Sequence, residues 1–531
     1  MTGLPQCAES INRLANQTGS LKEYEDLYIV LRNLSRDDLE VAVTQCNLLD
    51  IFSHMDLSDG NFSEAALNIA MIIFSTFRLI EFAHSHETEL LKSIMSKNLP
   101  LRDFVISRLS DGVKNSPPED IDIPETILLE ISNIAIAEEI TTASSARSFL
   151  MAFGEYHPNG VKILLNSESI GAFFASISAD EDVVRLSEIF AYIASKRQDT
   201  FKEMTDQRVF DRLITIIKKN DPLLQLNVTA VLKLLLVCHK GRAFLQLSGV
   251  VDLLFSDLQN LQSNPFHDML LPGYLNFFSS LAEEEPIAFL GNPNYRQPLA
   301  ICLARYLSSS DPIITTSVIE AVGQICITIN GKRKFAEYLK SGGCLSPLFT
   351  IAAAVMKNAS SDFLPRILIA LSDIINLPVA QDNLIDLIPV CELTQEWFGQ
   401  LCAPDPQIRA LKRIWDLAKQ PFKEVRAASL KLLRSIATEP WGITMFAELP
   451  AFMEHLFNPT TEAGTAMDGS SLQPEKFRIT EQCDRTQEIW KGVAPAWPLF
   501  DDLMAARVKK CVEEGIWGIR KVEAAVAMDN E

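Results

Sequence analysis

Two stretches of the chain, residues 220–255 and 310–349, are built on one pattern. In both, an Asp-Pro pair precedes a long apolar segment, a glycine follows, and two shorter apolar segments complete the stretch. Each Asp-Pro pair marks a helix start, because proline suits the first helical turn and the aspartate before it accepts hydrogen bonds from free amides. We expect the glycine to end the long helix. The matching positions are Asp221-Pro222 with Asp311-Pro312, Val228 with Val318, Gly241 with Gly331, and Gly249 with Gly343.

This pattern limits what the chain can fold into. A single helical hairpin cannot cover its own hydrophobic face, whereas stacked neighbours can, and armadillo and HEAT repeats of about 40 to 47 residues are built in this way. We therefore predict an all-α fold, an armadillo/HEAT-type right-handed superhelical solenoid. Its long helices are expected to begin near Asp180, Asp221, Asp268, Asp311, Asp362 and Phe422.

The composition agrees with a folded protein and argues against one class of partner. Of the 531 residues, 47% are hydrophobic and 22% charged, which is enough apolar material for a large core. The formal net charge is −20, and such an excess of carboxylates repels phosphate. We expect no nucleic acid among the partners, and prefer partners with basic or mixed surfaces.

Several features point to a reducing compartment. The ten cysteines form no CxxC pair and look like small core residues. The first residues, MTGLPQCAESINRLAN, do not read as a signal peptide, and the most apolar stretch, residues 65–80, is too polar for a membrane span. We expect a cytoplasmic protein that makes no use of a membrane, and leave access to the nucleus open.

The chain is expected to divide into three parts. Residues 1–457 read as the armadillo/HEAT-like repeat solenoid. Residues 458–475 are poor in bulky apolar side chains and are predicted to be a flexible insertion. Residues 476–531 regain a helical pattern and are predicted to form a C-terminal helical cap with a disordered end.

Catalytic motifs are missing from the sequence. It contains no GxxxxGK[ST], GxSxG or HExxH, and the seven histidines are dispersed. His84 and His86 are a close pair, but residues two apart on a helix point to different faces, so a solvated helix end is favoured over a metal site. Trp441, which follows a proline, is read as a core aromatic residue. We predict no enzyme, no cofactor and no metal.

A protein of this kind works through its surface. The last helix of each repeat is expected to line a concave wall whose exposed side chains meet the partner. The acidic runs 180–182 and 283–285 fit either a solvated helix end, which is favoured, or a contact for a basic partner. The residues predicted to bind the partner are Asp252, Ser256, Asp257, Glu337 and Lys340.

Two segments resemble a known family. Residues 264–282, NPFHDMLLPGYLNFFSSLA, and residues 427–446, AASLKLLRSIATEPWGITMF, are similar in composition and order to segments of the 26S proteasome non-ATPase regulatory subunit 5 family. The GVVDLL and NGKRKF elements occur in the same order, and the resemblance covers about residues 181–457.

The resemblance implies a role. The family looks like solenoids that act as assembly chaperones of the base of the proteasome regulatory particle. They bind the C-terminal domain of a AAA+ ATPase subunit and hold an ATPase pair until the base docks on the core particle. It thus implies proteasomal AAA+ ATPase subunits as partners, and leaves open a large non-ATPase base subunit. We expect a monomer when the protein is free.

The alternative is an importin-like transport adaptor or a general protein-interaction scaffold. An adaptor of the importin class uses tryptophan and asparagine four residues apart to clamp an extended basic peptide, and no Trp-x-x-x-Asn occurs in this sequence.

Overall fold

The computed structural model describes residues 21–35, 37–39, 60–137, 140–219, 221–342, 347–360, 362–378, 384–403, 406–462, 471–493 and 496–518. Every regular element in these ranges is a helix, which confirms the predicted all-α fold. The chain divides into two compact units, Met1–Val250 and Val251–Glu531.

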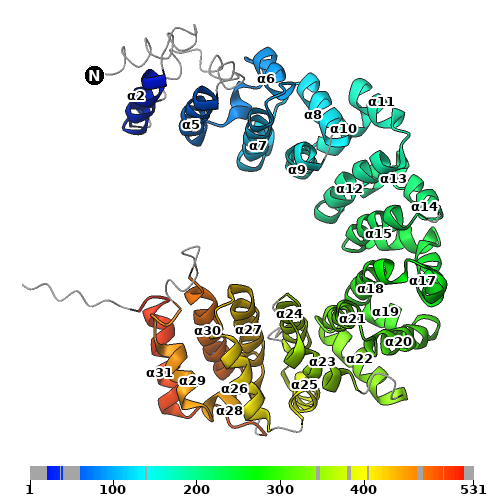
Figure 1. Ribbon diagram of the computed structural model, residues 1–531, viewed down its shortest axis with the longest axis vertical. Coiled ribbons are helices and arrows are strands. Elements are labelled where there is room, and N and C mark those ends of the chain that lie inside the picture. The colour runs from blue at the N-terminus through cyan, green and yellow to red at the C-terminus, as the bar shows by residue number, and fades with distance from the viewer. Residues whose placement is uncertain are drawn as a thin grey trace, which may run out of the picture. The chain divides into compact units, whose positions relative to one another are not determined.

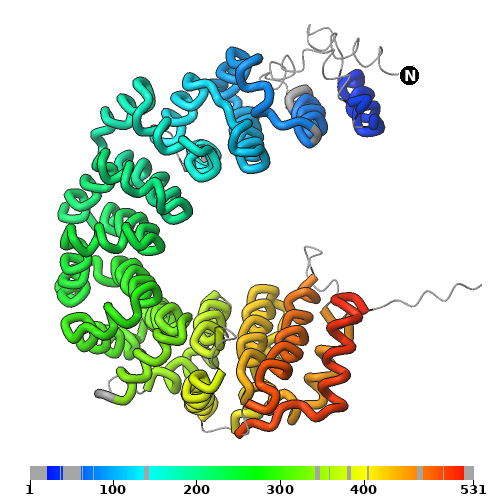
Figure 2. The backbone as a smooth tube through the Cα atoms, turned by 180° about the vertical axis from the view of Figure 1, so that it is seen from behind, coloured from blue at the N-terminus to red at the C-terminus, as the bar shows by residue number. Residues whose placement is uncertain are grey.

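In the first unit, long helices pack side by side in one row. Helices α7, α9, α12 and α15 each pack against the next, and shorter helices such as α10, α11, α13 and α14 lie on the other side of the row (Figures 1 and 2). The elements of this unit are α2 (Leu21–Arg32), α5 (Gly60–Thr76), η1 (Leu79–Phe82), α6 (Glu87–Ile94), α7 (Leu99–Asn115), η2 (Pro118–Asp120), α8 (Glu125–Ala137), α9 (Ile140–Tyr156), α10 (Gly160–Asn166), α11 (Glu168–Ser176), α12 (Asp180–Lys196), α13 (Phe201–Asp206), α14 (Asp211–Ile216), α15 (Pro222–Leu236) and α16 (His239–Leu247).

The second unit has the same two-layer construction. Its row of long helices is α18, α21, α24, α27, α30 and α31, in which each helix again packs against its successor. The elements are α17 (Val250–Asn260), η3 (Leu261–Ser263), α18 (His267–Glu284), α19 (Pro286–Gly291), α20 (Pro293–Leu307), α21 (Pro312–Ile325), α22 (Ile329–Gly342), α23 (Leu348–Asn358), α24 (Leu364–Ile375), η4 (Leu384–Leu387), α25 (Ile388–Cys402), α26 (Gln407–Leu417), α27 (Lys423–Ala437), α28 (Pro440–Ala447), α29 (Pro450–Phe457), α30 (Gln473–Trp490) and α31 (Asp502–Glu514).

The long helices begin where the sequence predicts. Helices α12, α15, α18, α21, α24 and α27 start within two residues of the expected positions. The Asp221 side chain accepts hydrogen bonds from the amides of Leu223 at 3.0 Å and Leu224 at 3.2 Å. Asp311 accepts from the amide of Ile313 at 2.8 Å, so both Asp-Pro pairs cap a helix as expected.

The repeat length is also visible in the hydrogen bonds between neighbouring helices. Ser145 donates to Asp103 at 2.7 Å across 42 residues, and Gln207 donates to Asn166 at 2.8 Å across 41 residues. From α24 to α27 the separation is longer, because η4, α25 and α26 lie between them in the chain, and the bond from Lys431 spans 58 residues. Each repeat is thus tied to the next by polar contacts as well as by its apolar face.

The repeated glycines do not end the long helices, and this expectation was wrong. Gly241, Gly331 and Gly442 each occupy the third position of the following helix, in α16, α22 and α28. A Cβ atom would lie 2.2 Å from the carbonyl oxygen of Leu235 at Gly241, and 1.9 Å from that of Ile325 at Gly331. The glycine is therefore required because the following helix starts in direct contact with the end of the long one.

The C-terminal region is held by buried charges. At the described ends of the range 458–475, Glu462 is 1% exposed and pairs with Arg426, and the Lys476 ammonium donates to the Thr461 hydroxyl at 2.5 Å. Residues 463–470 lie outside the described residues, so the predicted insertion and its boundaries stay predictions.

The tail continues the row of long helices. Helix α30 packs on α27 and α31 packs on α30, and the Trp497 indole donates to Gln395 on α25 at 2.9 Å. Trp490 is buried, and Trp441 is buried as predicted for a core aromatic residue. The disordered end predicted for the tail falls largely on residues 519–531, which lie outside the described residues.

Candidate interaction surface

The described residues offer no cluster of His, Cys, Asp and Glu side chains that could hold a metal ion. His84 instead contacts Asp122, with 2.9 Å between Nε2 and Oδ2. The buried thiols are not poised as nucleophiles, since burial raises the pKa of Cys302 and of Cys326 to about 12. The candidate site is the surface that carries the predicted partner-binding residues.

The five residues predicted to bind a partner lie on two helices outside the row formed by α18, α21, α24, α27, α30 and α31. Asp252, Ser256 and Asp257 are on α17, whereas Glu337 and Lys340 are on α22. Asp252, Ser256, Glu337 and Lys340 are exposed, and Asp257 is half-buried. The structure thus places three of the residues together and two on a separate helix.

Both aspartates on α17 already have partners inside the protein. The Tyr295 hydroxyl, on α20, donates to Asp252 across 43 residues. Asp257 is hydrogen-bonded to Tyr274 of α18, and burial raises the pKa of the Asp257 carboxyl. These two carboxylates hold α17 against its neighbours, and Ser256 is exposed on the same helix.

The two predicted residues on α22, Glu337 and Lys340, also differ in whether they have partners inside the protein. Glu337 forms ion pairs with Lys334 at 3.0 Å and with Arg296 at 3.8 Å. Lys340 is exposed and, within the part of the chain that the structure describes, has no ionic partner. The role of all five residues in partner binding stays a prediction, with Ser256 and Lys340 the freest of them.

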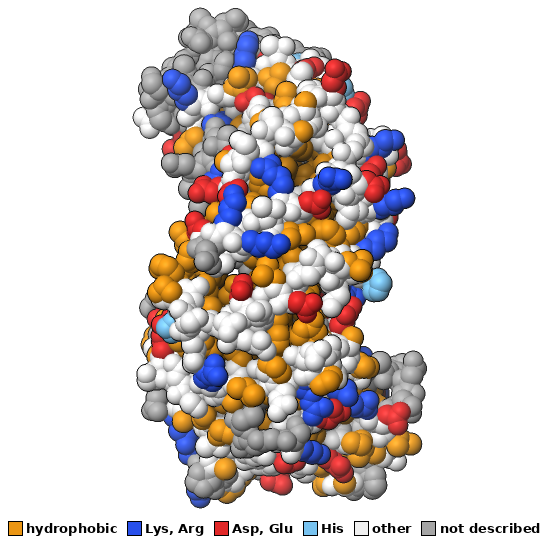
Figure 3. All heavy atoms as spheres, turned by 90° about the vertical axis from the view of Figure 1, so that its right-hand side faces the viewer, with side chains coloured by type: hydrophobic (Ala, Val, Ile, Leu, Met, Phe, Trp, Pro, Cys, Tyr) orange, Lys and Arg blue, Asp and Glu red, His pale blue; other side chains and the backbone are white. Residues whose placement is uncertain are grey.

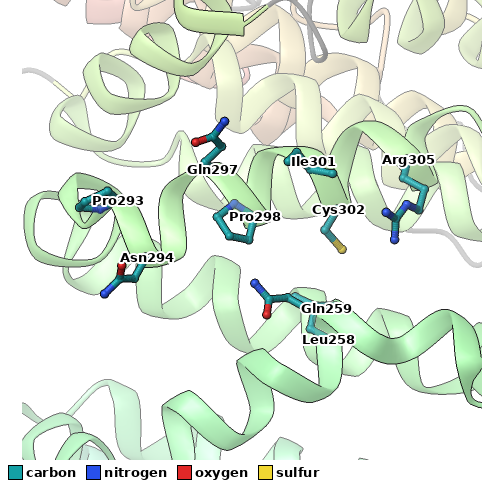
Figure 4. A pocket seen from close by; sticks show the side chains of 9 residues that line it. All are labelled: Leu258, Gln259, Pro293, Asn294, Gln297, Pro298, Ile301, Cys302 and Arg305. Atoms are coloured by element: carbon teal, nitrogen blue, oxygen red, sulfur yellow. The ribbon is translucent and has the colours of Figure 1, made fainter.

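A groove lies beside the α17 residues, between α17 and α20 (Figure 4). It has a volume of about 540 Å³, and its α17 wall ends in Gln259, which is one helical turn after Ser256. Figure 4 shows Leu258 and Gln259 on one side and the α20 side chains on the other. The α20 wall consists of Pro293, Asn294, Gln297, Pro298, Ile301, Cys302 and Arg305.

The α20 wall offers an unusual set of polar groups. Pro298 lies inside the helix and has no amide hydrogen, so the Asn294 carbonyl lacks its usual donor four residues on. The Gln297 amide and the exposed Arg305 guanidinium add donors beside Ile301, which is 47% exposed. The sequence prediction missed this wall, although a proline amid polar residues at helical spacing could have indicated it.

A second groove, of about 400 Å³, runs along the long helices α18, α21 and α24. Several of its polar side chains already have partners within the protein. Gln324 of α21 donates to Glu283 of α18, and Arg366 of α24 pairs with Glu320 of α21 at 2.6 Å. This groove is therefore largely satisfied from within.

The surface carries charges of both signs. On the face shown in Figure 3, described Lys and Arg side chains are interspersed with Asp and Glu, and hydrophobic side chains show between them. Among the described residues, no helix is both long and apolar enough to cross a bilayer. The fold and these surfaces define a helical-repeat protein of the protein-interaction class.

Comparison with known proteins makes this class specific. Over residues 5–531 the chain matches the family described as "Proteasome non-ATPase 26S subunit". The chain belongs to this proteasome subunit family, which confirms the resemblance expected from the sequence. The family match covers more of the chain than the resemblance expected for residues 181–457, and it includes the C-terminal residues 476–531.

Curated relatives agree with this assignment. The human 26S proteasome non-ATPase regulatory subunit 5 is 22% identical over 463 residues, covering 86% of this chain and 88% of the human protein. The Drosophila melanogaster protein of the same name is 22% identical over 298 residues, covering 55% of each chain.

Solved structures to which the chain is similar include importin beta and a karyopherin. A crystal structure of importin beta in a polyethylene glycol condition has a TM-score of 0.47 and 14% identity, covering 88% of this chain and 65% of that one. A crystal structure of the karyopherin Kap121p bound to the SUMO protease Ulp1p has a TM-score of 0.47 and 14% identity, covering 96% of this chain and 60% of that one.

Proposed function

We propose that this protein is an assembly chaperone of the base of the 26S proteasome regulatory particle. It binds the C-terminal domain of a AAA+ ATPase subunit and holds an ATPase pair before the base docks on the core particle. The observation that carries this proposal is the family match over residues 5–531. In this proposal the protein acts by binding and not as an enzyme.

The contact surface we assign to the ATPase domain is the groove between α17 and α20. Leu258 and Gln259 form one edge, and Gln297 and Arg305 form the other. Ser256 is exposed on α17, one helical turn before Gln259. Such a surface has exposed apolar area at its centre and hydrogen-bonding groups around it, which is the usual anatomy of a protein–protein contact. Lys340 extends the proposed surface on α22.

Binding to isolated ATPase domains tests the proposal. The full chain is titrated calorimetrically with the C-terminal domain of each proteasomal AAA+ ATPase subunit in turn. We expect one domain to bind with micromolar or tighter affinity. If no domain binds, the chaperone role is wrong.

Charge and size changes then locate the contact. Ser256→Arg and Arg305→Glu should each weaken binding of that domain at least tenfold, since they add bulk or reverse charge at the groove. Lys162→Glu, which makes the same reversal at an exposed site on α10, should leave the affinity unchanged. A domain that binds all three variants equally well uses another surface.

The transport-adaptor alternative has a separate test. Titration with a Lys-rich extended peptide should give no measurable binding if the chaperone proposal holds. Micromolar or tighter binding of that peptide, together with no binding of ATPase domains, would favour the adaptor.

A further inference from the structure

The first unit contains a groove that combines an exposed apolar stripe with two carboxylates that have no partner among the described residues. It lies between the long helices α12 and α15, with Arg147 of α9 at its border, and has a volume of about 650 Å³. It is separate from the groove between α17 and α20, and nothing in the proposed function uses it.

The α15 wall is an exposed apolar stripe. Leu223, Ala230 and Leu234 line the groove, with Asn227 between them, at successive spacings of four, three and four residues. Leu223 is 65% exposed. The opposite face of the same helix is buried in the core, through residues such as Val228, Leu232 and Leu235.

Helix α15 is thus apolar on two sides, although one side would suffice to anchor it. An exposed apolar stripe on a surface helix, bordered by polar residues, is typical of a docking site.

The α12 wall presents two carboxylates that are not engaged. Glu181 and Glu188 line the groove, and in the described ranges neither has a hydrogen-bond or ion-pair partner. They are seven residues apart, so about 10 Å separates them along the helix axis. Arg185 lies between them but donates to the Ile136 carbonyl at 2.6 Å and contacts Asp182 at 3.3 Å.

The comparable groove of the second unit shows what a satisfied surface looks like. There Arg366 is bonded to Glu320, and Asp373 accepts from Lys431 at 2.9 Å. The same position in the repeat is therefore self-paired in one unit and left with an apolar stripe and two unpaired acids in the other. This difference points to a partner that supplies what is missing.

We propose that the groove between α12 and α15 binds an amphipathic α-helix of a partner protein. The apolar side of that helix packs on Leu223, Ala230 and Leu234, and basic side chains two turns apart pair with Glu181 and Glu188. A helix fits better than a strand, because the groove walls are helices whose backbone groups are already bonded and offer no sheet edge. The lining from Leu223 to Leu234 spans about 16 Å, which corresponds to three turns of the bound helix.

A synthetic helix tests the proposal. The probe is an 18-residue peptide with a Leu/Ala stripe at helical spacing and Lys at two positions seven residues apart, labelled for fluorescence anisotropy. A second peptide carries Glu in place of both Lys. We expect the Lys peptide to bind the full chain at least tenfold more tightly than the Glu peptide, and failure of the Lys peptide to bind at millimolar concentration would overturn the proposal.

Variants establish that binding occurs in this groove. Leu223→Asp should weaken binding of the Lys peptide at least tenfold, whereas Leu247→Asp, at an 89% exposed position on α16, should not change it. Glu181→Lys with Glu188→Lys should reverse the preference, so that the Glu peptide binds more tightly. Equal binding to Leu223→Asp and Leu247→Asp, or no reversal, would show that the groove is not the site.

Two further measurements separate other occupants and the proposed function. Sedimentation of the free chain should show a monomer. If the chain self-associates and Leu223→Asp abolishes this association, the groove is an interface between copies and the proposal is overturned. Leu223→Asp should still bind the ATPase domain through the groove between α17 and α20. The two proposals therefore fail independently.

Discussion

Arg366 on α24 holds the carboxylate of Glu320 on α21 through two parallel hydrogen bonds, with Nε to Oε1 at 2.7 Å and Nη2 to Oε2 at 2.6 Å. The two residues are 46 positions apart, which is one repeat, and both side chains are partly open to water. The pair therefore joins successive long helices at the surface of the groove that they line.

Removing this pair should cost little stability. The side chains are 40% and 35% exposed, and solvent screening limits such a pair to about 0.2–1 kcal/mol. We expect Glu320→Gln to lower the free energy of unfolding of the second unit by less than about 1 kcal/mol. A double-mutant cycle with Arg366→Met, measured by urea unfolding, gives the pair energy directly, and a coupling above about 2 kcal/mol would contradict the solvent-screened account.

The glycine positions should be far more sensitive. A Cβ at Gly331 would lie 1.9 Å from the Ile325 carbonyl oxygen, which is a backbone atom with little room to adjust. We expect Gly331→Ala to destabilise the second unit by about 2 kcal/mol or more, which is typical of overpacking in a core. The measurement is the midpoint of thermal unfolding followed by circular dichroism.

Gly291 supplies the matched control. It also lies in a helix of the second unit, but a Cβ there would meet nothing within 4 Å. Gly291→Ala should leave the unfolding midpoint unchanged or raise it slightly, because alanine restricts the unfolded chain. If both substitutions have the same effect, close approach is not the reason for the glycine at 331.

The sequence allowed the long helices to be predicted because their signals are local. An Asp-Pro pair and apolar residues at helical spacing act within a few positions, so the starts of α15 and α21 followed from the chain alone. The place of Gly331 was misjudged for the opposite reason. Its requirement comes from the carbonyl of Ile325, and a glycine near a helix end looks the same whether it ends that helix or opens the next.

The candidate surface was harder to predict. Asp252 and Asp257 were predicted to bind a partner, but their hydrogen-bond partners Tyr295 and Tyr274 come from other helices, at separations that no local pattern shows. In the same way, the unpaired state of Glu188 becomes visible only once its neighbours in space are known. The exposed face of a helix can be predicted from the sequence more readily than which polar groups on that face already have hydrogen-bond or ion-pair partners.

Lys332 should be among the most sensitive charged residues. Its side chain is fully buried, and its ammonium donates to the carbonyl oxygens of Asp373 at 3.0 Å and Ile374 at 2.5 Å, at the end of α24. Lys332→Met would leave these carbonyls without donors, and removing one partner from a buried charged cluster costs about 3–5 kcal/mol. We expect a loss of this size in urea unfolding of the second unit.

Two comparisons sharpen that prediction. Lys334→Met, two residues away, removes an exposed ion pair with Glu337 and should cost less than about 1 kcal/mol. Glu439 is also fully buried, and burial raises the pKa of its carboxyl, so Glu439→Gln should be tolerated better than Lys332→Met. Similar losses for Lys332→Met and Lys334→Met would show that capping of α24 is unimportant.

His455 should make the stability of the C-terminal region depend on pH. Burial lowers the pKa of this imidazole to about 4, and the positive charges of Lys476, Lys419 and Arg426 act in the same direction. The carboxylate that faces it belongs to Glu462, with 3.6 Å between Nε2 and Oε1. Between about pH 4 and 6.5 the unfolded chain therefore takes up a proton at His455 that the folded protein excludes.

The sign of the effect follows from this proton uptake. The contribution of His455 is fully present above pH 6.5 and is lost as the pH falls toward 4, at about 1.4 kcal/mol per pH unit at most. From pH 6.5 to pH 5 the loss reaches about 2 kcal/mol. Glu462 acts in the opposite direction, because burial raises its pKa and its contribution is lost as the pH rises through the folded-state value.

Comparing the wild type with His455→Gln separates these opposing effects, because Glu462 is present in both proteins. Urea unfolding followed by tryptophan fluorescence at pH 7, 6 and 5 should show the wild type losing about 2 kcal/mol more than the variant over this range. Parallel losses in the two proteins would mean that the buried imidazole takes up its proton in the folded state as readily as in the unfolded chain. Stability would then be limited at low pH by carboxylates alone, and the difference between the two proteins would be the same at every pH.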